Sequence, residues 1–428
     1  MSRLLEEILS DDNLDRALKA VKANKGAPGV DGMKVSQLED YLTEHREEMR
    51  EKLRQRKYKP LPVRRVGIPK GDGTLRPLGI PSVKDRWLQQ AVYQVLSPKC
   101  EEVFSDSSFG FRPNRRCEDA ILKALEYFND GYDWVVDLDL SKFFDNVDQN
   151  ILMILAHDII KDGDTESIIR KFLHSGVNIG GVISPTIKGT PQGGNLSPLL
   201  ANIYLNVFDR ELEKRGLRFT RYADDCIICV RSKAAANRVM TSVTRWLKEK
   251  LRVEVNATKT KVGKPQDIKY LGFAFYRKED GVYRPKPHIR SIERLKQKLH
   301  DESIRSVSTS IACKIIRLNP IIRGWINYFR ICDMKVSMTR LDGYLRTRIR
   351  MCIWKQWKVP PKRQWALQKL GVSKDLARLT SYCGDRYYWI AHRTCVLRAI
   401  SKEKLSRAGL VDPSDYYITR HNLKLDLI

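Results

Sequence analysis

The strongest constraint on the fold of this chain is an apolar run broken by two adjacent carboxylates. It reads Arg221-Tyr222-Ala223-Asp224-Asp225-Cys226-Ile227-Ile228-Cys229-Val230. The β-favouring residues on both sides of Asp224 and Asp225 predict two strands joined by a tight turn, with the acids at the tip. Because Asp is common in turns for its own backbone hydrogen bonds, an isolated pair of this kind is typical of a solvated turn.

A second acidic strand upstream favours a functional reason for the pair. Side chains alternate along residues 134–140, so Asp137 and Asp139 share one face of an apolar strand. An acid in such surroundings needs a charged partner or a metal. If Asp139 converges with Asp224 and Asp225, the three carboxylates would hold two hard cations such as Mg²⁺ about 3.5–4 Å apart, as phosphoryl transfer requires.

These motifs resemble the palm of reverse transcriptases encoded by bacterial group II introns. The resemblance is carried by Tyr222-Ala223-Asp224-Asp225, by Asp139 upstream, and by Gly189-Thr190-Pro191-Gln192-Gly193-Gly194 between them, and it covers nearly the whole chain. It implies an α+β right-hand polymerase fold. Residues 1–285 would form fingers and palm with an N-terminal extension, 286–372 a helical thumb or maturase domain, and 373–428 a small helical DNA-binding module.

The resemblance implies an RNA-directed DNA polymerase that also acts as a maturase in intron splicing and mobility. Asp139, Asp224 and Asp225 would be catalytic and would bind two Mg²⁺ ions, with Mn²⁺ as a substitute. Asp225 is the least secure of the three, because successive strand side chains diverge unless the turn brings them together. The implied partners are group II intron RNA, an RNA template with a DNA primer, target DNA and deoxynucleotides.

Four residues are candidates for binding the incoming nucleotide. Lys70 and Arg76 flank Asp72-Gly73, a strong hairpin turn, so two cations on opposing strands could embrace a triphosphate, although plain surface charge is the alternative. Phe144 lies five residues after Asp139, the offset at which the family excludes a ribose 2′-OH. Gln192 matches the family residue that packs on the nucleotide and template.

Other motifs predict contacts with template or primer. Arg112 lies in a loop that mixes aromatic and basic residues, which suits nucleic acid but also suits a packed aromatic corner. Lys259 matches a palm lysine that is a candidate proton donor to pyrophosphate, and a solvated surface charge is the alternative. Leu271 and Gly272, within Lys269-Tyr270-Leu271-Gly272-Phe273, match the loop that holds the primer terminus.

The C-terminal third predicts a helical, strongly basic body. Residues 281–428 hold 31 Lys and Arg against 11 Asp and Glu, whereas the whole chain has a net charge of +27. Helical periodicity predicts helices over 289–300, 311–329 and 341–357, and shorter pieces beyond 373. This distribution favours a polyanionic partner for the third. A helical bundle with a charged outside is the alternative.

The remaining features narrow the class of protein. Nine scattered cysteines form no disulfide framework and Cys226-x-x-Cys229 has no matching second pair, so we expect a reducing compartment and no zinc site. No apolar run approaches about 18 residues and nothing resembles a signal peptide. We therefore expect a soluble protein of the bacterial cytoplasm, associated with nucleoid or ribonucleoprotein and not with membrane.

The C-terminus lacks clustered Cys and His with metal-ligand spacing and leaves no room for a ribonuclease H domain. We therefore expect the endonuclease-lacking, class C-like kind of intron protein. Two rival functions stay open. One is a splicing-only RNA-binding maturase with a vestigial polymerase site. The other is a reverse transcriptase recruited to phage defence or CRISPR spacer acquisition. The presence of every expected acid, of Lys70 and of Arg76 disfavours the first.

Overall fold

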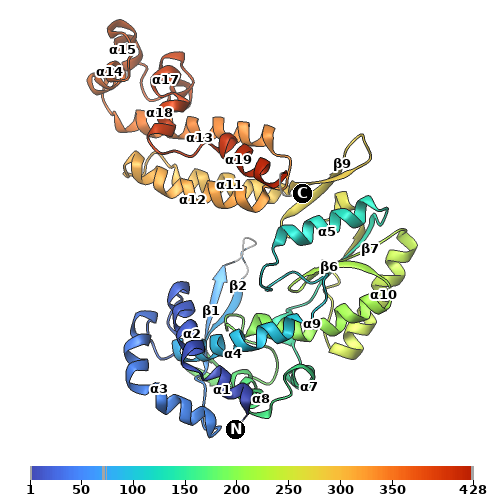
Figure 1. Cartoon of the computed structure of the whole chain (residues 1–428). Helices are drawn as coiled ribbons and strands as arrows, with labels where there is room; N and C mark the ends of the chain where they lie inside the picture. Colours follow the sequence, from blue (N-terminus) through green and yellow to red (C-terminus); the bar gives the residue numbers. More distant parts are fainter. Residues whose placement is uncertain (1, 70–72, 74, 426–428) are drawn as a thin grey trace. The chain divides into compact units, whose positions relative to one another are not determined.

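The chain forms two compact units, Met1–Pro265 and Gln266–Ile428 (Figure 1). The computed structural model describes residues 2–69, 73 and 75–425. Strands and helices mix in the first unit and helices dominate the second, which confirms the predicted α+β class. The first unit carries the acidic strands.

The central sheet of the first unit brings the two acidic segments together. Its strand order is β6-β7-β3-β8, with bounds Arg218–Tyr222, Asp225–Val230, Trp134–Asp139 and Lys261–Gly263, and each neighbouring pair is antiparallel. Val136 and Leu138 of β3 and Ile228 of β7 are buried in the main core. The predicted alternation on β3 is therefore observed, since Asp137 and Asp139 lie on the opposite face.

A second sheet holds the predicted basic hairpin. Its order is β2-β1-β4-β5, with bounds Leu75–Ile80, Val63–Pro69, Val177–Ile179 and Val182–Ser184. β1 and β2 pair antiparallel up to Pro69 opposite Leu75, and β1 pairs in parallel with β4. The hairpin is thus confirmed as far as its strands are described, while Lys70 lies outside the described residues.

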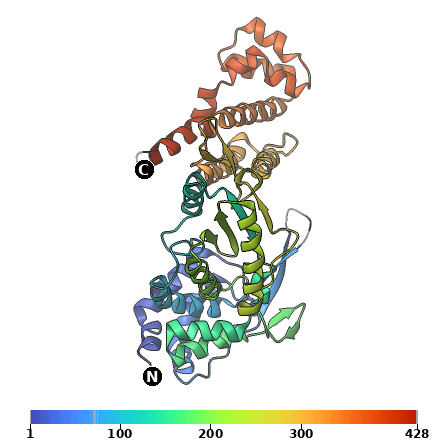
Figure 2. The ribbon, with the colours of Figure 1, turned by 90° about the vertical axis from the view of Figure 1, so that its right-hand side faces the viewer.

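Helices surround both sheets of the first unit. α10 (Lys233–Leu251) packs against β3, β7 and β8, and Figure 2 shows it lying lengthwise across that sheet. α9 (Ser197–Lys214) contributes Leu205, Phe208 and Leu212 to the core. The other helices are α1 Arg3–Ile8, α2 Asp11–Asn24, α3 Leu38–Arg54, α4 Val83–Glu101, α5 Cys117–Asn129, α6 Phe143–Asn146, α7 Gln149–Ile160 and α8 Gly163–Leu173, with 3-10 turns at Val35–Gln37 and Pro265–Asp267.

Polar caps fix where several helices begin. The Ser82 hydroxyl accepts the Asp85 N–H at the start of α4, and the Asp148 carboxylate accepts the N–H groups of Asn150 and Ile151 at the start of α7. Such caps satisfy N–H groups that have no partner within the helix. The Ser82 cap explains the sharp start of α4 after Pro81.

The second unit is a helical body with one hairpin, β9 Phe273–Arg277 and β10 Tyr283–Pro287. The ring of Phe273 lies 4.8 Å from Phe329 and 5.6 Å from Tyr328, so the hairpin packs on α12 within this unit. The resemblance assigned this hairpin to residues 1–285, but the observed division comes earlier, at Pro265. A further division at 372 stays a prediction.

This body contains three long helices, as the periodicity predicts: α11 Ile289–Glu302, α12 Ile311–Phe329 and α13 Lys335–Gln356. α19 (Pro413–Leu425) packs on α12 and α13. Between α13 and α19 lie α14 Pro360–Lys369, α15 Lys374–Ser381, α16 Tyr387–Ala391, α17 Thr394–Ala399 and α18 Lys402–Arg407. None of the helices in the described part of the chain has the length and apolar character to cross a bilayer.

Candidate active site

The β6–β7 hairpin places its two acids beside Asp139. Tyr222 pairs with Asp225 across a two-residue turn of Ala223 and Asp224, and Ala223 has a left-handed φ of 58°. This φ sign is the one that short hairpin turns use to match strand twist. Asp225 also stands directly opposite Asp139 in the β3–β7 register. Directly opposed residues share a sheet face, so the structure brings these two predicted carboxylates together.

The three acids differ in environment. Asp225 is exposed, whereas Asp224 and Asp139 are partly buried. Burial raises the pKa of Asp224, and the nearby Asp139 carboxylate adds to that rise, while Arg76 opposes it. The Asp139 carboxylate is therefore near enough to Asp224 for the two negative charges to repel each other. A cation between them would relieve this repulsion.

Lys259 already neutralises one of these acids. Its Nζ lies 3.1 Å from Oδ2 of Asp139. The backbone of Asp139 is held by the same segment, because its N–H donates to the Thr260 hydroxyl at 3.2 Å and its carbonyl accepts the Asn256 N–H at 2.8 Å. No three His, Cys, Asp or Glu side chains within residues 2–69, 73 and 75–425 are gathered as a ready-made metal site.

Two of the predicted nucleotide-binding residues touch each other. Arg76 Nε donates to Gln192 Oε1 at 3.0 Å, which links β2 to the glycine-rich turn. The backbones approach closely there, since a Cβ added to Gly193 would lie 2.3 Å from the carbonyl oxygen of Gly79. Arg76 also acts electrostatically on Asp224. Arg76, Gln192 and the acidic turn are therefore neighbours.

Phe144 lies in α6 and supports the same turn through its backbone. Its carbonyl oxygen accepts the N–H of Thr190, two residues before Gln192, at 2.7 Å. Its side chain is buried, and its ring makes an edge contact with Phe143 at 5.4 Å between centroids. The ring is thus fixed by packing at a position close in sequence to Asp139, and its backbone is hydrogen-bonded to the turn.

A buried polar network beneath the hairpin was not predicted. Arg221 donates from Nε and Nη2 to the Asp209 carboxylate at 2.7 and 2.5 Å, and from Nη1 to the Asn202 side chain at 3.0 Å and the Ala223 carbonyl at 2.9 Å. Burial raises the pKa of Asp209, while Arg221 opposes that rise. Asn202 also donates to the carbonyl of Gly110 at 2.9 Å. The network ties the turn to α9.

The sequence contains a signal for this network. Asn202 and Asp209 fall at helical spacing on the same stripe as Leu205 and Leu212, so polar side chains occupy core positions of α9. Buried polar groups need partners, and Arg221 on the neighbouring strand supplies one. Gly110 completes the support, because a Cβ there would lie 2.3 Å from the Ala223 nitrogen.

The expected template or primer contact of Arg112 is wrong. Its side chain is 2% exposed and pairs with Glu101 at 2.8 Å. Nη1 also donates to the carbonyls of Ser105 and Ser108, and the guanidinium lies 5.3 Å from the centre of the Phe104 ring. The packed aromatic corner, the alternative left open by the sequence, is what the structure contains. The guanidinium N–H groups of Arg112 therefore donate to partners within the protein.

Leu271 and Gly272 lie in the second unit, at the turn before β9. Both have left-handed φ values, 50° and 83°. The turn is held by α11 and α12, since Ser291 donates to the Gly272 carbonyl at 3.0 Å and Tyr328 donates to the Leu271 carbonyl at 2.8 Å. This support fixes the backbone of the predicted primer loop within its own unit.

Comparison with known proteins identifies two family domains in this chain. Residues 68–275 match the family model described as "Reverse transcriptase (RNA-dependent DNA polymerase)", and residues 292–371 match "Group II intron, maturase-specific domain". Protein YkfC of Escherichia coli (strain K12) is 33% identical over 65% of this chain and 84% of its own length. The chain belongs to the family of group II intron reverse transcriptases. It is an RNA-directed DNA polymerase with a maturase-specific domain, and its family uses divalent metal ions.

Other relatives of the intron reverse transcriptase match over shorter stretches. Group II intron-encoded protein LtrA of Lactococcus lactis subsp. cremoris is 37% identical over 53% of this chain, but the match spans only 38% of LtrA. Among solved structures, telomerase from Candida albicans aligns with 79% of this chain and 67% of its own at 13% identity, with a TM-score of 0.45. That likeness is too weak to add to the family assignment.

Proposed function

We propose that this intron reverse transcriptase copies RNA into DNA at the β3/β6–β7 site, with Asp139, Asp224 and Asp225 as catalytic residues. The observation that supports this proposal is the register pairing of Asp139 with Asp225. The adjacent turn holds Asp224, whose pKa is raised in part by the Asp139 carboxylate. Carboxylates from distant parts of the chain meet at one sheet end. That is the arrangement phosphoryl transfer needs.

The donor set at this site fits two Mg²⁺ ions, with Mn²⁺ as a substitute. Carboxylate oxygens are the protein ligands that such hard cations prefer, and mutual repulsion between Asp139 and Asp224 favours cation binding. Asp139 and Asp224 would share the ions, and exposed Asp225 would contribute from the strand end. Bound metal would supply activation of the primer 3′-OH and neutralisation of the pyrophosphate. Lys259 would leave Asp139 when the ions bind, and we propose it as the proton donor to pyrophosphate.

We propose that Lys70, Arg76, Phe144 and Gln192 form the nucleotide side of the site. Arg76 presents a planar guanidinium that suits phosphate oxygens, and its bond to Gln192 holds both on the glycine-rich turn. Phe144 would exclude a ribose 2′-OH, since its ring is fixed by core packing and cannot easily yield. Leu271 and Gly272 would hold the primer terminus.

The second unit is proposed to bind the intron RNA in splicing and the target DNA in mobility. Its charge surplus supports a polyanionic partner, and its matched maturase-specific domain supports RNA. Class C-like membership and action within a bacterial ribonucleoprotein of the cytoplasm, near the nucleoid, belong to this proposal.

Primer extension tests the polymerase role directly. Asp224→Asn keeps the side-chain volume and removes the charge, so we expect DNA synthesis on an RNA template with Mg²⁺ to fall by about 10²–10³-fold or more, with RNA binding retained. Asp106→Asn is the matched control, because its side chain is 97% exposed and pairs with Arg115 outside the site. Full synthesis by Asp224→Asn would refute the assignment. Splicing without any synthesis by the unaltered protein would favour the splicing-only function.

A further inference from the structure

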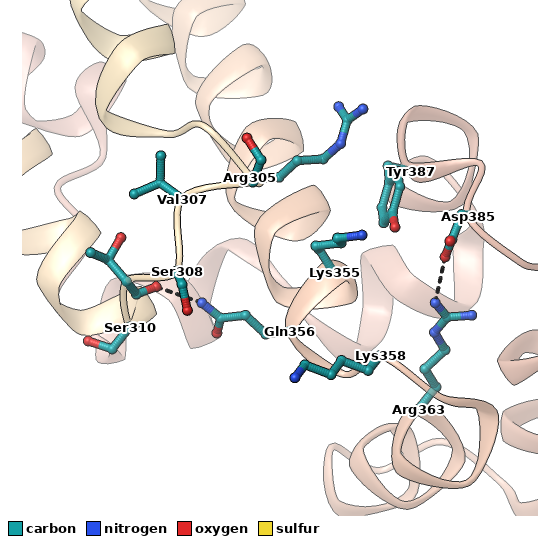
Figure 3. Close-up of a pocket in the computed structure, with 12 residues that line it drawn as sticks. Arg305, Val307, Ser308, Ser310, Lys355, Gln356, Lys358, Arg363, Asp385 and Tyr387 are labelled. Carbon is teal, nitrogen blue, oxygen red and sulfur yellow. Dashed lines mark hydrogen bonds and ion pairs between the residues drawn. The ribbon is translucent and has the colours of Figure 1, made fainter.

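The second unit contains a pocket of about 480 Å³ far along the chain from the polymerase residues (Figure 3). Four segments line it: the loop 305–310 between α11 and α12, the end of α13 with the residues after it, Arg363 of α14, and the start of α16 with the residues before it. The volume falls within the range of about 300–1,000 Å³ typical of small-ligand sites. The pocket is too small for a nucleic-acid duplex. Its volume suits a single nucleotide.

The lining is basic, hydroxyl-rich and aromatic. Arg305, Lys355 and Lys358 are exposed around the pocket, and Figure 3 shows Arg305 and Lys355 on the same side of it as Tyr387. Arg305 lies 4.8 Å and Lys355 5.4 Å from the centre of the Tyr387 ring. Both cations lie over an aromatic ring. They can turn from it to a phosphate, for which the charge-assisted hydrogen bond is stronger.

The acid of the pocket is already neutralised. Asp385 pairs with Arg363 at 2.8 Å, and Arg363 also stacks over Trp354, with its guanidinium carbon 4.8 Å from the ring centre. Figure 3 draws this ion pair at one end of the pocket, away from Ser308. The lining holds four cations against this one acid, so an anion entering the pocket meets net positive charge.

The loop that forms one wall is held in place by side chains from neighbouring helices. Gln356 donates to the Thr309 carbonyl at 2.7 Å, buried Lys314 donates to the Ile304 carbonyl at 2.9 Å, and Arg348 donates to the Ser303 carbonyl at 3.0 Å. These bonds fix the backbone on both sides of Ser306 and Ser308. A wall ordered before the ligand arrives lowers the entropic cost of binding.

We propose that this pocket binds one unpaired nucleotide of an RNA strand. Arg305, Lys355 and Lys358 would contact the phosphates on either side, and Tyr387 would stack on the base. The hydroxyls of Ser306 and Ser308 hydrogen-bond no other residue of the described chain, and a serine can both donate to and accept from a ribose 2′-OH. This inference rests on the proposed RNA-binding role and names its ligand.

The test is binding of a fluorescent oligouridylate to the full chain at several salt concentrations. Lys355→Gln/Lys358→Gln should weaken binding about tenfold or more and reduce the slope of log affinity against log salt by about 1.4, since each single-strand phosphate contact contributes about 0.7. The matched control is Lys369→Gln/Lys374→Gln, which removes two exposed charges of the same unit outside the pocket. Tyr387→Leu should weaken binding about tenfold without changing the slope.

Two comparison ligands make the outcome specific. The oligodeoxyuridylate should bind more weakly than the oligouridylate to the unaltered protein, and Ser306→Ala/Ser308→Ala should remove that difference. Cross-linking of a thiouridine-substituted strand should label Tyr387 or its neighbours. Equal losses in the pocket and control variants, equal losses on blunt duplex RNA, or equal binding of RNA and DNA each overturn the proposal. Primer extension by the unaltered protein reports separately on the polymerase, so the two failures are distinguishable.

Discussion

The guanidinium of Arg221 and the carboxylate of Asp209 form a bidentate ion pair whose side chains are 1% and 0% exposed. Arg221 also donates to the Ala223 carbonyl in the turn that carries Asp224. The position of the turn that carries Asp224 therefore depends on a charge pair buried away from the surface. Because both charges are desolvated, loss of either one leaves the other buried without compensation and destabilises the fold.

Removal of one partner of the Arg221–Asp209 pair should destabilise the fold far more than removal of both. We expect Asp209→Leu or Arg221→Met alone to lower the free energy of unfolding of the first unit by about 3–5 kcal/mol, and the double variant to lose less than either. Urea titration measures this. The exposed pair Lys123–Glu126 is the control, where Lys123→Gln should cost about 0.3–0.5 kcal/mol. Additive losses at Asp209 and Arg221 would contradict a buried, coupled pair.

Gly110 should be intolerant of a single methyl group. In Gly110→Ala, the new Cβ would lie 2.3 Å from the Ala223 nitrogen and 2.8 Å from the Tyr222 carbonyl carbon, so the hairpin must shift. We expect primer extension to fall about 10²-fold, as when reacting groups are misplaced by about 1 Å. Gly343→Ala, in the middle of α13 with open space around it, should instead stabilise the chain by about 0.5–1 kcal/mol. Unchanged extension by Gly110→Ala would show that the hairpin does not need this close packing.

The proposed sugar selection by Phe144 predicts a change in the ratio of ribonucleotide to deoxynucleotide use. We expect Phe144→Val to raise the use of ribonucleotides relative to deoxynucleotides by about tenfold or more, because a smaller side chain leaves room for the 2′-OH. Both nucleotides are measured on one sample, so partial unfolding cancels. Phe143→Val removes the adjacent buried ring and should leave the ratio unchanged. If both variants change the ratio equally, core packing and not the ring at Phe144 sets it.

Asp148 should make the stability of the first unit depend on pH. Burial opposes its ionisation, but N–H groups of Ile151 and Asn150 and the Arg252 guanidinium, 2.7 Å away, hold the pKa of Asp148 below its usual value. A lowered pKa stabilises the fold above the unfolded pKa of about 3.9, and this contribution is lost as pH falls through the folded value.

Two substitutions separate the cap from the charge. Asp148→Ala should cost about 1 kcal/mol at neutral pH, while Asp148→Asn keeps a cap and loses the pH-dependent part. The measurement is the thermal midpoint of the first unit against pH. The gap between the unaltered protein and Asp148→Asn should close as pH falls below about 4. A gap that is constant with pH would show that ionisation of Asp148 does not stabilise the fold.

Local patterns predicted much of this fold. Alternation placed Asp137 and Asp139 on one face of β3, and helical periodicity predicted α12 over the residues where it is observed. The pairing of Asp139 with Asp225 could be expected only from the family resemblance, because register between strands far apart in sequence depends on tertiary packing.

Local patterns did not reveal several contacts, because each depends on a partner in another element of the fold. The loop composition made Arg112 a candidate for nucleic-acid contact, but in the fold its side chain pairs with Glu101 of α4. The β9–β10 hairpin joins the second unit because Phe273 packs on Phe329 of α12, which no local pattern reveals. Lys259 was expected as a proton donor or a surface charge, and its ion pair with Asp139 became visible only in the folded chain.

The hydrogen bond from Thr190 N–H to the Phe144 carbonyl joins the proposed sugar gate to the turn that carries Gln192. A backbone shift at one of these sites is transmitted to the other through a 2.7 Å contact. Tolerance of an altered sugar and fidelity of template copying should therefore change together in this enzyme. Attempts to engineer one trait while preserving the other will have to preserve this peptide link.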